Sequence, residues 1–265
     1  KICWKLDGAT EEQVRRFRKE GRLQVTDQGA TIPWLCPTHP DNLQLEKDAV
    51  RDLVKRYEVD GIHLDYIRYA DGHTCFCARC REAYVRDTGK LAGAWPPPAD
   101  KWELRKDFYR WRAGNITRLV RDISALSRGI RPGIKISAAV YGKYPSCVDG
   151  VGQDWPAWLR SGYLDFVCPM DYTADPARFT DYVRSQMALT DISTRIYPGI
   201  GVTATESRLD AMQVVDQVAI LRRLGTDNPS ILLYADKHGS ISMLEELHEL
   251  YGCTIVTLGG TPSLM

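Results

Sequence analysis

Short apolar runs alternate along the chain with longer segments whose apolar residues recur every three or four positions. Six runs indicate strands: Ile2–Leu6, Gly61–Ile67, Ile134–Val140, Leu164–Met170, Ile196–Val202 and Ser230–Tyr234. Five segments have helical periodicity: Leu43–Tyr57, Trp102–Ser127, Pro176–Leu189, Arg208–Leu224 and Ser240–Tyr251. Strands that alternate with helices in this way predict an α/β protein with parallel strand pairing and helices on the outer face.

The spacing of the runs favours a barrel of parallel strands. From Ile134 onward each run begins 30 to 35 residues after the one before, which is the length of one βα unit. An eight-stranded (β/α)8 barrel of the TIM type needs two more units than the pattern supplies. The chain opens at Lys1 almost inside a strand, so we expect the missing pair to precede it. Residues 1–265 are therefore expected to form a single partial TIM-barrel domain with an open edge, unless the fold closes in an unusual way.

Composition limits the classes of binding partner that this chain can have. The 265 residues carry a formal net charge of +1, and charges of both signs alternate along the helices, which argues against nucleic acid or an anionic membrane. No apolar run approaches the roughly 20 residues that cross a bilayer. Seven Trp and thirteen Tyr against five Phe favour the amphipathic rings that line sugar sites. Eight cysteines is a high count for a cytosolic enzyme, and we expect an extracellular or periplasmic protein with a carbohydrate partner.

The most informative stretch is Val-Asp-Gly-Ile-His-Leu-Asp-Tyr-Ile-Arg-Tyr, residues 59–69. Strand side chains alternate between two faces, so His63 and Asp65 share a face that cannot be an ordinary apolar core face. A carboxylate at the C-terminal end of a buried strand is costly unless it is paired or used. In barrels of parallel strands that end holds the active site. We therefore predict that Asp65 is catalytic, the alternative being that it caps the next loop through backbone amides.

A second carboxyl group stands at the same level of the predicted barrel. Asp171 directly follows the run Leu164–Met170, and its alternative role is that of a helix cap. Hydrolysis of a glycosidic bond takes two carboxyl groups, one that donates a proton and one that acts as nucleophile or base. Arg68 would keep Asp65 ionised, whereas the drier surroundings of Asp171 suit the proton donor.

Other polar and aromatic residues near the strand ends fit substrate binding, because tyrosine hydroxyls and charged groups can bond sugar hydroxyls. For Asp154, a helix N-terminal acid is an equally good interpretation. For His39, on a loop, a surface position is the better one. The residues expected to bind substrate are His39, His63, Arg68, Tyr69, Tyr141, Asp154, Trp155 and Tyr172.

A long loop at about residues 70–100 interrupts the strand–helix pattern and carries a cluster of metal-ligand residues. They are His73, Cys75, Cys77 and Cys80. With Cys36 as a substitute for His73, they can surround one Zn²⁺. The same thiols can instead form disulfides, one of them with Cys36, or remain free. A site with three thiolates is usually closed to water, so we expect no cofactor for catalysis and, if metal is bound, a structural zinc.

Six motifs occur in order along the chain: DGIHLDYIRY, CFCARCR, KISAAVYGKYP, GQDW, LDFVCPMDYT and YPGIGV. Together, from about Cys3 to Tyr234, they resemble the bacterial glycosyl-hydrolase-like family 10 proteins. The resemblance implies a TIM-barrel domain whose third to eighth strands are present, and glycoside hydrolysis without naming a sugar. The tail after Tyr234 departs from the family pattern.

Three functions follow from these residues. The first is a glycoside hydrolase that acts on a polysaccharide or oligosaccharide through Asp65 and Asp171. The second is a carbohydrate-binding pseudoenzyme that keeps the pocket without turnover. The third is a zinc-dependent hydrolase, such as a polysaccharide deacetylase, built on the cysteine and histidine cluster.

Overall fold

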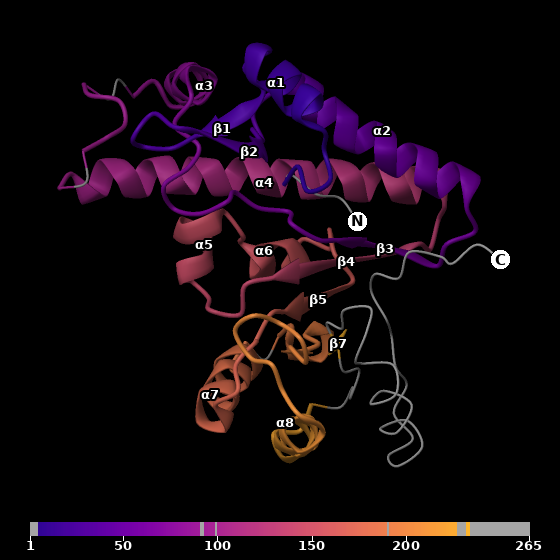
Figure 1. The fold of residues 1–265 in the computed structure, drawn as a ribbon. Helices are drawn as coiled ribbons and strands as arrows, with labels where there is room; N and C mark the ends of the chain where they lie inside the picture. Colours follow the sequence, from indigo (N-terminus) through magenta and orange to yellow (C-terminus); the bar gives the residue numbers. More distant parts are fainter. Residues whose placement is uncertain (1–4, 91–92, 99, 190, 227–231, 234–265) are drawn as a thin grey trace. The chain divides into compact units, whose positions relative to one another are not determined.

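The computed structural model describes residues 5–90, 93–98, 100–189, 191–226 and 232–233 (Figure 1). They form two compact units. The first contains Lys1–Ser137 and Pro145–Leu164, and the second contains Ala138–Tyr144 and Asp165–Met265. The predicted helix Ser240–Tyr251 lies outside the described residues. None of the described helices combines the length and the apolar character needed to cross a membrane.

The first unit begins with a helix and a hairpin that the hydrophobic pattern did not predict. Helix α1 (Glu11–Lys19) is almost entirely polar and begins with a capping box, so apolar periodicity could not reveal it. Strands β1 (Leu23–Val25) and β2 (Thr31–Leu35) pair antiparallel. Lys5 bridges Trp34 of β2, also antiparallel. The prediction of parallel pairing is therefore wrong for the described end of the first apolar run.

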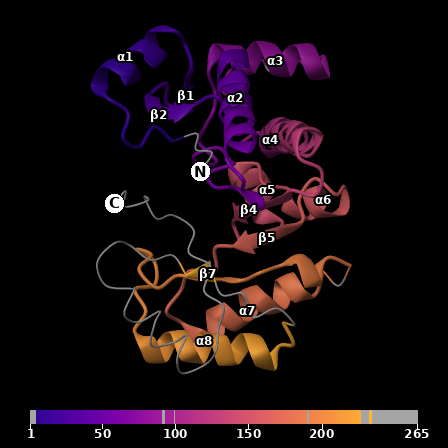
Figure 2. The ribbon, with the colours of Figure 1, turned by 90° about the vertical axis from the view of Figure 1, so that its right-hand side faces the viewer.

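Two long helices pack along each other in this unit (Figures 1 and 2). Helices α2 (Pro40–Arg56) and α4 (Trp102–Ile130) confirm the two predicted helical segments. Helix α2 begins three residues before the predicted start at Leu43, because the His39 side chain caps it and a proline fits the first helical position. The His39 Nδ1 atom accepts a hydrogen bond from the Asp41 amide at 3.3 Å.

Strand β3 (Gly61–Leu64) lies beside the start of β4 (Lys135–Val140). The Lys135 amide donates to the Asp60 carbonyl at 3.0 Å. The strands approach so closely that a Cβ atom at Gly61 would lie 2.9 Å from the Lys135 carbonyl oxygen, so this position requires glycine. Ile62 and Leu64 are buried, whereas Gly61 and His63 are not. This alternation confirms that β3 has one polar face.

An aromatic cluster holds the long loop after β3 against α4. Tyr84 of helix α3 (Ala78–Thr88) packs edge-on against Phe108, with ring centroids 5.5 Å apart. The Trp95 ring packs on Phe108 at 5.0 Å, and its Nε1 donates to the Phe76 carbonyl at 2.7 Å. The short helices α5 (Ser146–Val151) and α6 (Trp155–Arg160) complete the first unit.

Parallel strands alternate with helices in the second unit. After the end of β4 come β5 (Phe166–Pro169), α7 (Pro176–Met187), the 3-10 turn η1 (Ser193–Arg195), β6 (Gly199–Ile200), α8 (Ala211–Arg223) and β7 (Leu232–Leu233). The Met170 amide donates to the Val140 carbonyl at 2.7 Å, and Met170 bridges Gly199 in the parallel sense. Strands β6 and β7 are also parallel. Helices α7 and α8 pack on each other (Figure 2). Buried apolar residues form the core here: Phe179, Val183, Ile200, Val202, Leu209, Val214, Val218, Ile220 and Leu221.

The predicted α/β class is confirmed, and strands lie within the second to sixth apolar runs. Of the seven strands among the described residues, two form the antiparallel hairpin β1–β2. The two missing βα units and the open edge stay predictions.

Candidate active site

His63 near the C-terminal end of strand β3 and Asp65 directly after the strand are the two polar residues that the sequence analysis identified. His63 Nδ1 lies 2.8 Å from the Ser137 hydroxyl of β4. Burial lowers the pKa of His63 to about 4, although Asp65 nearby opposes the shift. His63 is therefore neutral at pH 7, and its ring can donate one hydrogen bond and accept another.

Asp65 follows the last residue of β3 and is half-buried. Its Oδ1 accepts a hydrogen bond from the Tyr66 amide at 2.9 Å. Tyr66 has a φ of 59°, a left-handed conformation that is uncommon for a bulky residue. Such a conformation costs about 1–3 kcal/mol and persists only where the surroundings impose it, often at functional sites. The bond from the Tyr66 amide is the loop cap that the sequence offered as the alternative role of Asp65, and its catalytic role stays a prediction.

Arg68 forms a platform with two aromatic rings beside this turn. Its guanidinium lies 4.9 Å from the Trp34 ring centroid and 5.1 Å from that of Tyr66. Its Nη1 also donates to the carbonyls of Tyr69 and Ala70, at 3.1 and 3.0 Å. Trp34 was missed by the sequence analysis, because nothing local indicates that β2 brings it to this turn.

Asp171 stands just after β5 in the second unit and is completely buried. Its Oδ1 accepts a hydrogen bond from Gln186 Nε2 at 2.8 Å, whereas its Oδ2 has no hydrogen-bond partner among the described residues. Burial raises the pKa of Asp171 to about 7, and the bond from Gln186 opposes the shift only in part. This carboxyl group holds its proton in the pH range where a general acid is used.

Gly142, after β4, makes room for this carboxyl group. A Cβ atom at Gly142 would lie 2.0 Å from Asp171 Oδ1 and 2.8 Å from Gln186 Nε2. No side chain fits such a gap without displacing the carboxyl group. Gly142 and Gln186 belong to the site, although the sequence carried no signal for either beyond the glycine itself.

The pH dependence of stability tests the burial of Asp171. A carboxyl group whose pKa is higher in the folded state than its unfolded value, near 4, destabilises the protein as pH rises through that window. Between pH 4 and pH 7 the ionisation of Asp171 should lower the free energy of unfolding of the wild type by up to about 4 kcal/mol. Asp171→Asn has no carboxyl group at this position, so we expect the variant not to show this decrease. The variant should thus gain stability over the wild type as pH rises, as measured by urea denaturation at pH 4.5 and 8.

Asp181→Asn is the matched control, because Asp181 is exposed on α7 of the same unit. It should leave the difference between the two pH values unchanged. A wild-type-like pH dependence in Asp171→Asn would mean that Asp171 is ionised in the folded protein.

Tyr172, directly after Asp171, and Tyr141, directly after β4, differ in exposure. Tyr172 is half-buried, and its ring lies beside Gly199 of β6 and Gly201 just after it: a Cβ atom at Gly201 would be 2.7 Å from ring carbons of Tyr172. Tyr141, directly after β4, is 41% exposed. Both tyrosines remain candidates for substrate binding.

Three residues predicted to bind substrate are buried by the first unit. Tyr69 and Trp155 have no exposed surface. Tyr69 is held by the Arg112 guanidinium 4.2 Å from its ring and by Asn115, which donates to its hydroxyl at 3.5 Å. His39 is 5% exposed and caps α2. All three side chains pack inside the unit, and their roles in substrate binding stay predictions.

Asp154 precedes helix α6 and is half-buried. Burial raises its pKa, opposed by a backbone hydrogen bond from Ala157 and by Arg160. Its position just before α6 is that of the helix N-terminal acid given as the alternative, and a role in substrate binding stays a prediction.

The cysteines converge as the sequence suggested, with one exchange. The sulfurs of Cys36, Cys75, Cys77 and Cys80 lie within 4.8 Å of one another, and all four side chains are buried. The predicted ligand His73 is not in this group. Its side chain is largely exposed, and its Nδ1 lies 3.0 Å from Asp27. Of the two candidates for the fourth ligand, the structure places Cys36, and not His73, beside the three cysteines, while metal binding stays a prediction.

A protein-family comparison decides the relationship of this chain. The model described as glycosyl hydrolase-like 10 matches residues 10–206. The chain belongs to this family. Two curated relatives are an S-layer-related protein of Niallia circulans and glycosyl hydrolase YngK of Bacillus subtilis (strain 168). The first is 20% identical over 234 residues, 74% of this chain and 14% of the relative. The second is 22% identical over 156 residues, 51% of this chain and 27% of the relative. This glycosyl hydrolase-like 10 chain thus spans a minor part of the length of each.

Solved structures with a similar fold are glycoside hydrolases. The glycoside hydrolase domain of PgaB (BpsB) from Bordetella bronchiseptica matches with a TM-score of 0.68 at 18% identity, over 87% of this chain and 69% of that one. A β-galactosidase from Bacillus circulans sp. alkalophilus matches with a TM-score of 0.63 at 12% identity, over 86% of this chain and 40% of that one. At these identities the likeness establishes the fold alone. This chain therefore has the TIM-barrel type of fold that these glycoside hydrolases have.

Proposed function

We propose that this member of the glycosyl hydrolase-like 10 family is a glycoside hydrolase that uses Asp65 and Asp171 to cleave a polysaccharide or oligosaccharide. The observation that carries the proposal is Asp171: a fully buried carboxyl group at the end of β5 whose pKa is raised to about 7. A glycosidase needs such a group to protonate the leaving oxygen at neutral pH.

Asp65 has the complementary role in this proposal. It is half-buried at the end of β3, where a backbone amide bonds one oxygen and leaves the carboxylate in a polar environment. In this role the carboxylate attacks the anomeric carbon or takes a proton from water. Asp171 gives its proton to the glycosidic oxygen as the bond to the anomeric carbon breaks.

Substrate binding is assigned to side chains that keep accessible surface near these carboxyl groups. In the first unit these are His63 and Arg68, and in the second Tyr141 and Tyr172. The guanidinium of Arg68, stacked on Trp34, offers a fixed hydrogen-bond donor beside an apolar ring. Rings and planar donors of this kind suit the mixed polar and apolar surface of a sugar.

The S-layer-related relative supports an extracellular or surface location for the protein that contains this chain. No nucleic-acid partner is proposed.

The direct test measures release of reducing sugar ends from a panel of polysaccharides by the wild type and by Asp65→Asn, with and without a metal chelator. Turnover by the wild type that survives chelation and disappears in Asp65→Asn supports the proposal. Binding of polysaccharides without turnover would favour a pseudoenzyme. Release of acetate that stops on chelation would favour a zinc-dependent deacetylase.

A further inference from the structure

Four buried cysteines of the first unit lie outside the proposed active site. Cys36 directly follows β2, Cys75 lies on the loop after β3, and Cys77 and Cys80 lie at the cap and in the first turn of α3. Cys36 is separated from the others by 39 to 44 residues of sequence. A long stretch of chain therefore closes to bring four sulfurs together in the interior.

The distances between the sulfurs have the values of a metal site. The Cys36 sulfur lies 3.8, 3.7 and 3.6 Å from those of Cys75, Cys77 and Cys80. In a tetrahedron with Zn–S bonds of about 2.3 Å, the sulfurs are about 3.8 Å apart. A disulfide would place one sulfur about 2.05 Å from a single partner. Near-equal distances from one sulfur to three others fit a tetrahedral centre and not a set of bridges.

Neighbouring amide and hydroxyl groups form hydrogen bonds with the sulfurs, as they do with the ligands of bound metals. The Val25 amide donates to Cys75 Sγ and the Cys80 amide to Cys77 Sγ, both at 3.4 Å. The Thr38 hydroxyl lies 3.0 Å from Cys36 Sγ and 3.3 Å from Cys80 Sγ. The N-terminal end of α3 also favours negative charge on its first-turn cysteines. Bonds of this kind orient ligands and stabilise thiolates.

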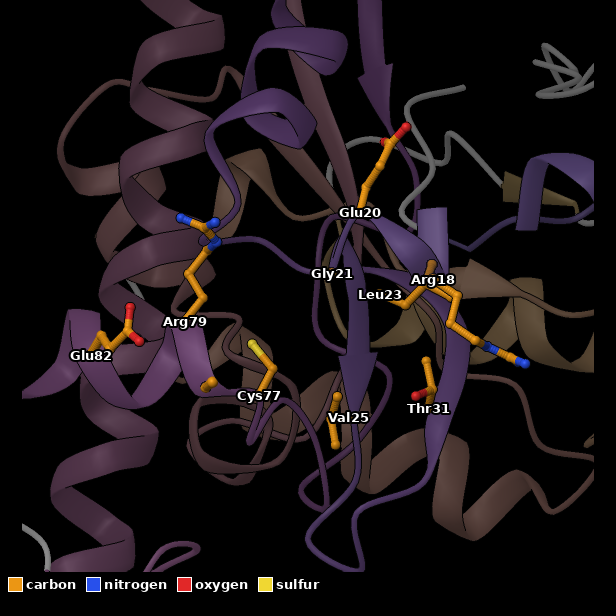
Figure 3. Close-up of a pocket in the computed structure, with 10 residues that line it drawn as sticks. Arg18, Glu20, Gly21, Leu23, Val25, Thr31, Cys77, Arg79 and Glu82 are labelled. Carbon is orange, nitrogen blue, oxygen red and sulfur yellow. The ribbon is translucent and has the colours of Figure 1, made fainter. Parts of the chain in front are cut away.

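A path for entry exists at Cys77. Cys77 is 8% exposed, whereas the other three cysteines have no exposed surface. It lines a cavity of about 360 Å³ together with Gly21, Arg79 and Glu82, and Figure 3 draws its sulfur facing the space between Arg79 and Gly21. Ligand number, spacing, surrounding bonds and access thus all meet the requirements of a metal site.

We propose that Cys36, Cys75, Cys77 and Cys80 bind one Zn²⁺ as a closed structural site. Four thiolates leave no open position for water, so this zinc takes no part in bond cleavage. The ion ties the β1–β2 hairpin to the loop that follows Asp65 and to the start of α3. Its binding energy contributes to folding of the first unit, as in other small structural zinc sites.

The test is the metal content of the purified protein, prepared without chelator and measured by elemental analysis. We expect about one equivalent of zinc per chain. Cys36→Ser and Cys80→Ser should each lose zinc by more than about tenfold, since even outer partners of a zinc site cost that much. Cys147→Ser and Cys168→Ser, which replace buried cysteines outside the cluster, should keep the full equivalent.

Measurements on the wild type keep the proposal testable if the serine variants do not fold. Titration with an organomercurial should release the zinc as the cluster thiols react, and removal of zinc should lower the unfolding temperature. A zinc-free protein whose intact mass is reduced by two hydrogens per bridge would overturn the proposal in favour of disulfides. Zinc-free protein with all thiols reduced, zinc retained in both cluster variants, or iron in place of zinc would also overturn it.

Discussion

Asp65→Ala is expected to abolish hydrolysis on every substrate, with a loss of at least about 10⁴-fold in kcat/KM. In the proposed mechanism the substitution removes the carboxylate that attacks the anomeric carbon or activates water. Initial rates on aryl glycosides and on the natural polysaccharide measure the loss. If Asp65 is the nucleophile, a small anion such as azide should restore part of the rate in the alanine variant.

Asp60→Ala is the matched control, because Asp60 is exposed at the opposite end of the same strand. Residues at the N-terminal end of barrel strands serve stability more than catalysis. Its kcat/KM should stay within about threefold of the wild type. Full activity of Asp65→Ala would remove Asp65 from the mechanism.

Asp171→Ala should have an effect that depends on the leaving group. A natural sugar leaving group needs a proton, so the rate should fall by about 10²–10⁴-fold. A nitrophenolate leaves without protonation, so the decrease in rate on a nitrophenyl glycoside should be much smaller. The ratio of the two losses, measured with a series of aryl glycosides of increasing leaving-group pKa, reports directly on proton donation.

The pH profile provides a second readout for the same residue. The basic limb of kcat/KM in the wild type should reflect the raised pKa of Asp171, about 7, and should disappear in Asp171→Ala. Equal losses on good and poor leaving groups would exclude Asp171 as the acid. The opposite pattern, with Asp65→Ala sensitive to the leaving group, would exchange the two roles.

The sequence could predict those features that depend on local periodicity. Alternation along residues 61–65 identified a strand with one polar face, and the structure confirms it. The same reasoning placed Asp171 at the end of an apolar run, and β5 ends just before it. Helices α2, α4, α7 and α8 have apolar faces, and the pattern found each of them. Helix α1, which is nearly all polar, gave no such signal.

Burial of individual polar groups depended on packing between distant segments. Asp171 has a raised pKa because its carboxyl group is buried, with Gly142 against it from 29 residues before it in the chain. The hydrogen bond from Gln186, 15 residues after it, opposes the shift in part. Tyr69 and Trp155 stand close in sequence to polar positions, yet the first unit packs both inside. Spacing along the chain carries no information about which side chains a neighbouring element will cover.

The sequence by itself determined the α/β order of elements, the two carboxyl groups that end strands, and the close spacing of Cys75, Cys77 and Cys80. The tertiary structure alone decided that Cys36 joins these three cysteines while His73 turns outward to Asp27. It also decided that the side chain of Asp171 is fully buried and that strands β1 and β2 pair antiparallel. Strand and helix periods are local, whereas ligand sets and pKa values depend on which distant segments the folded chain brings into contact.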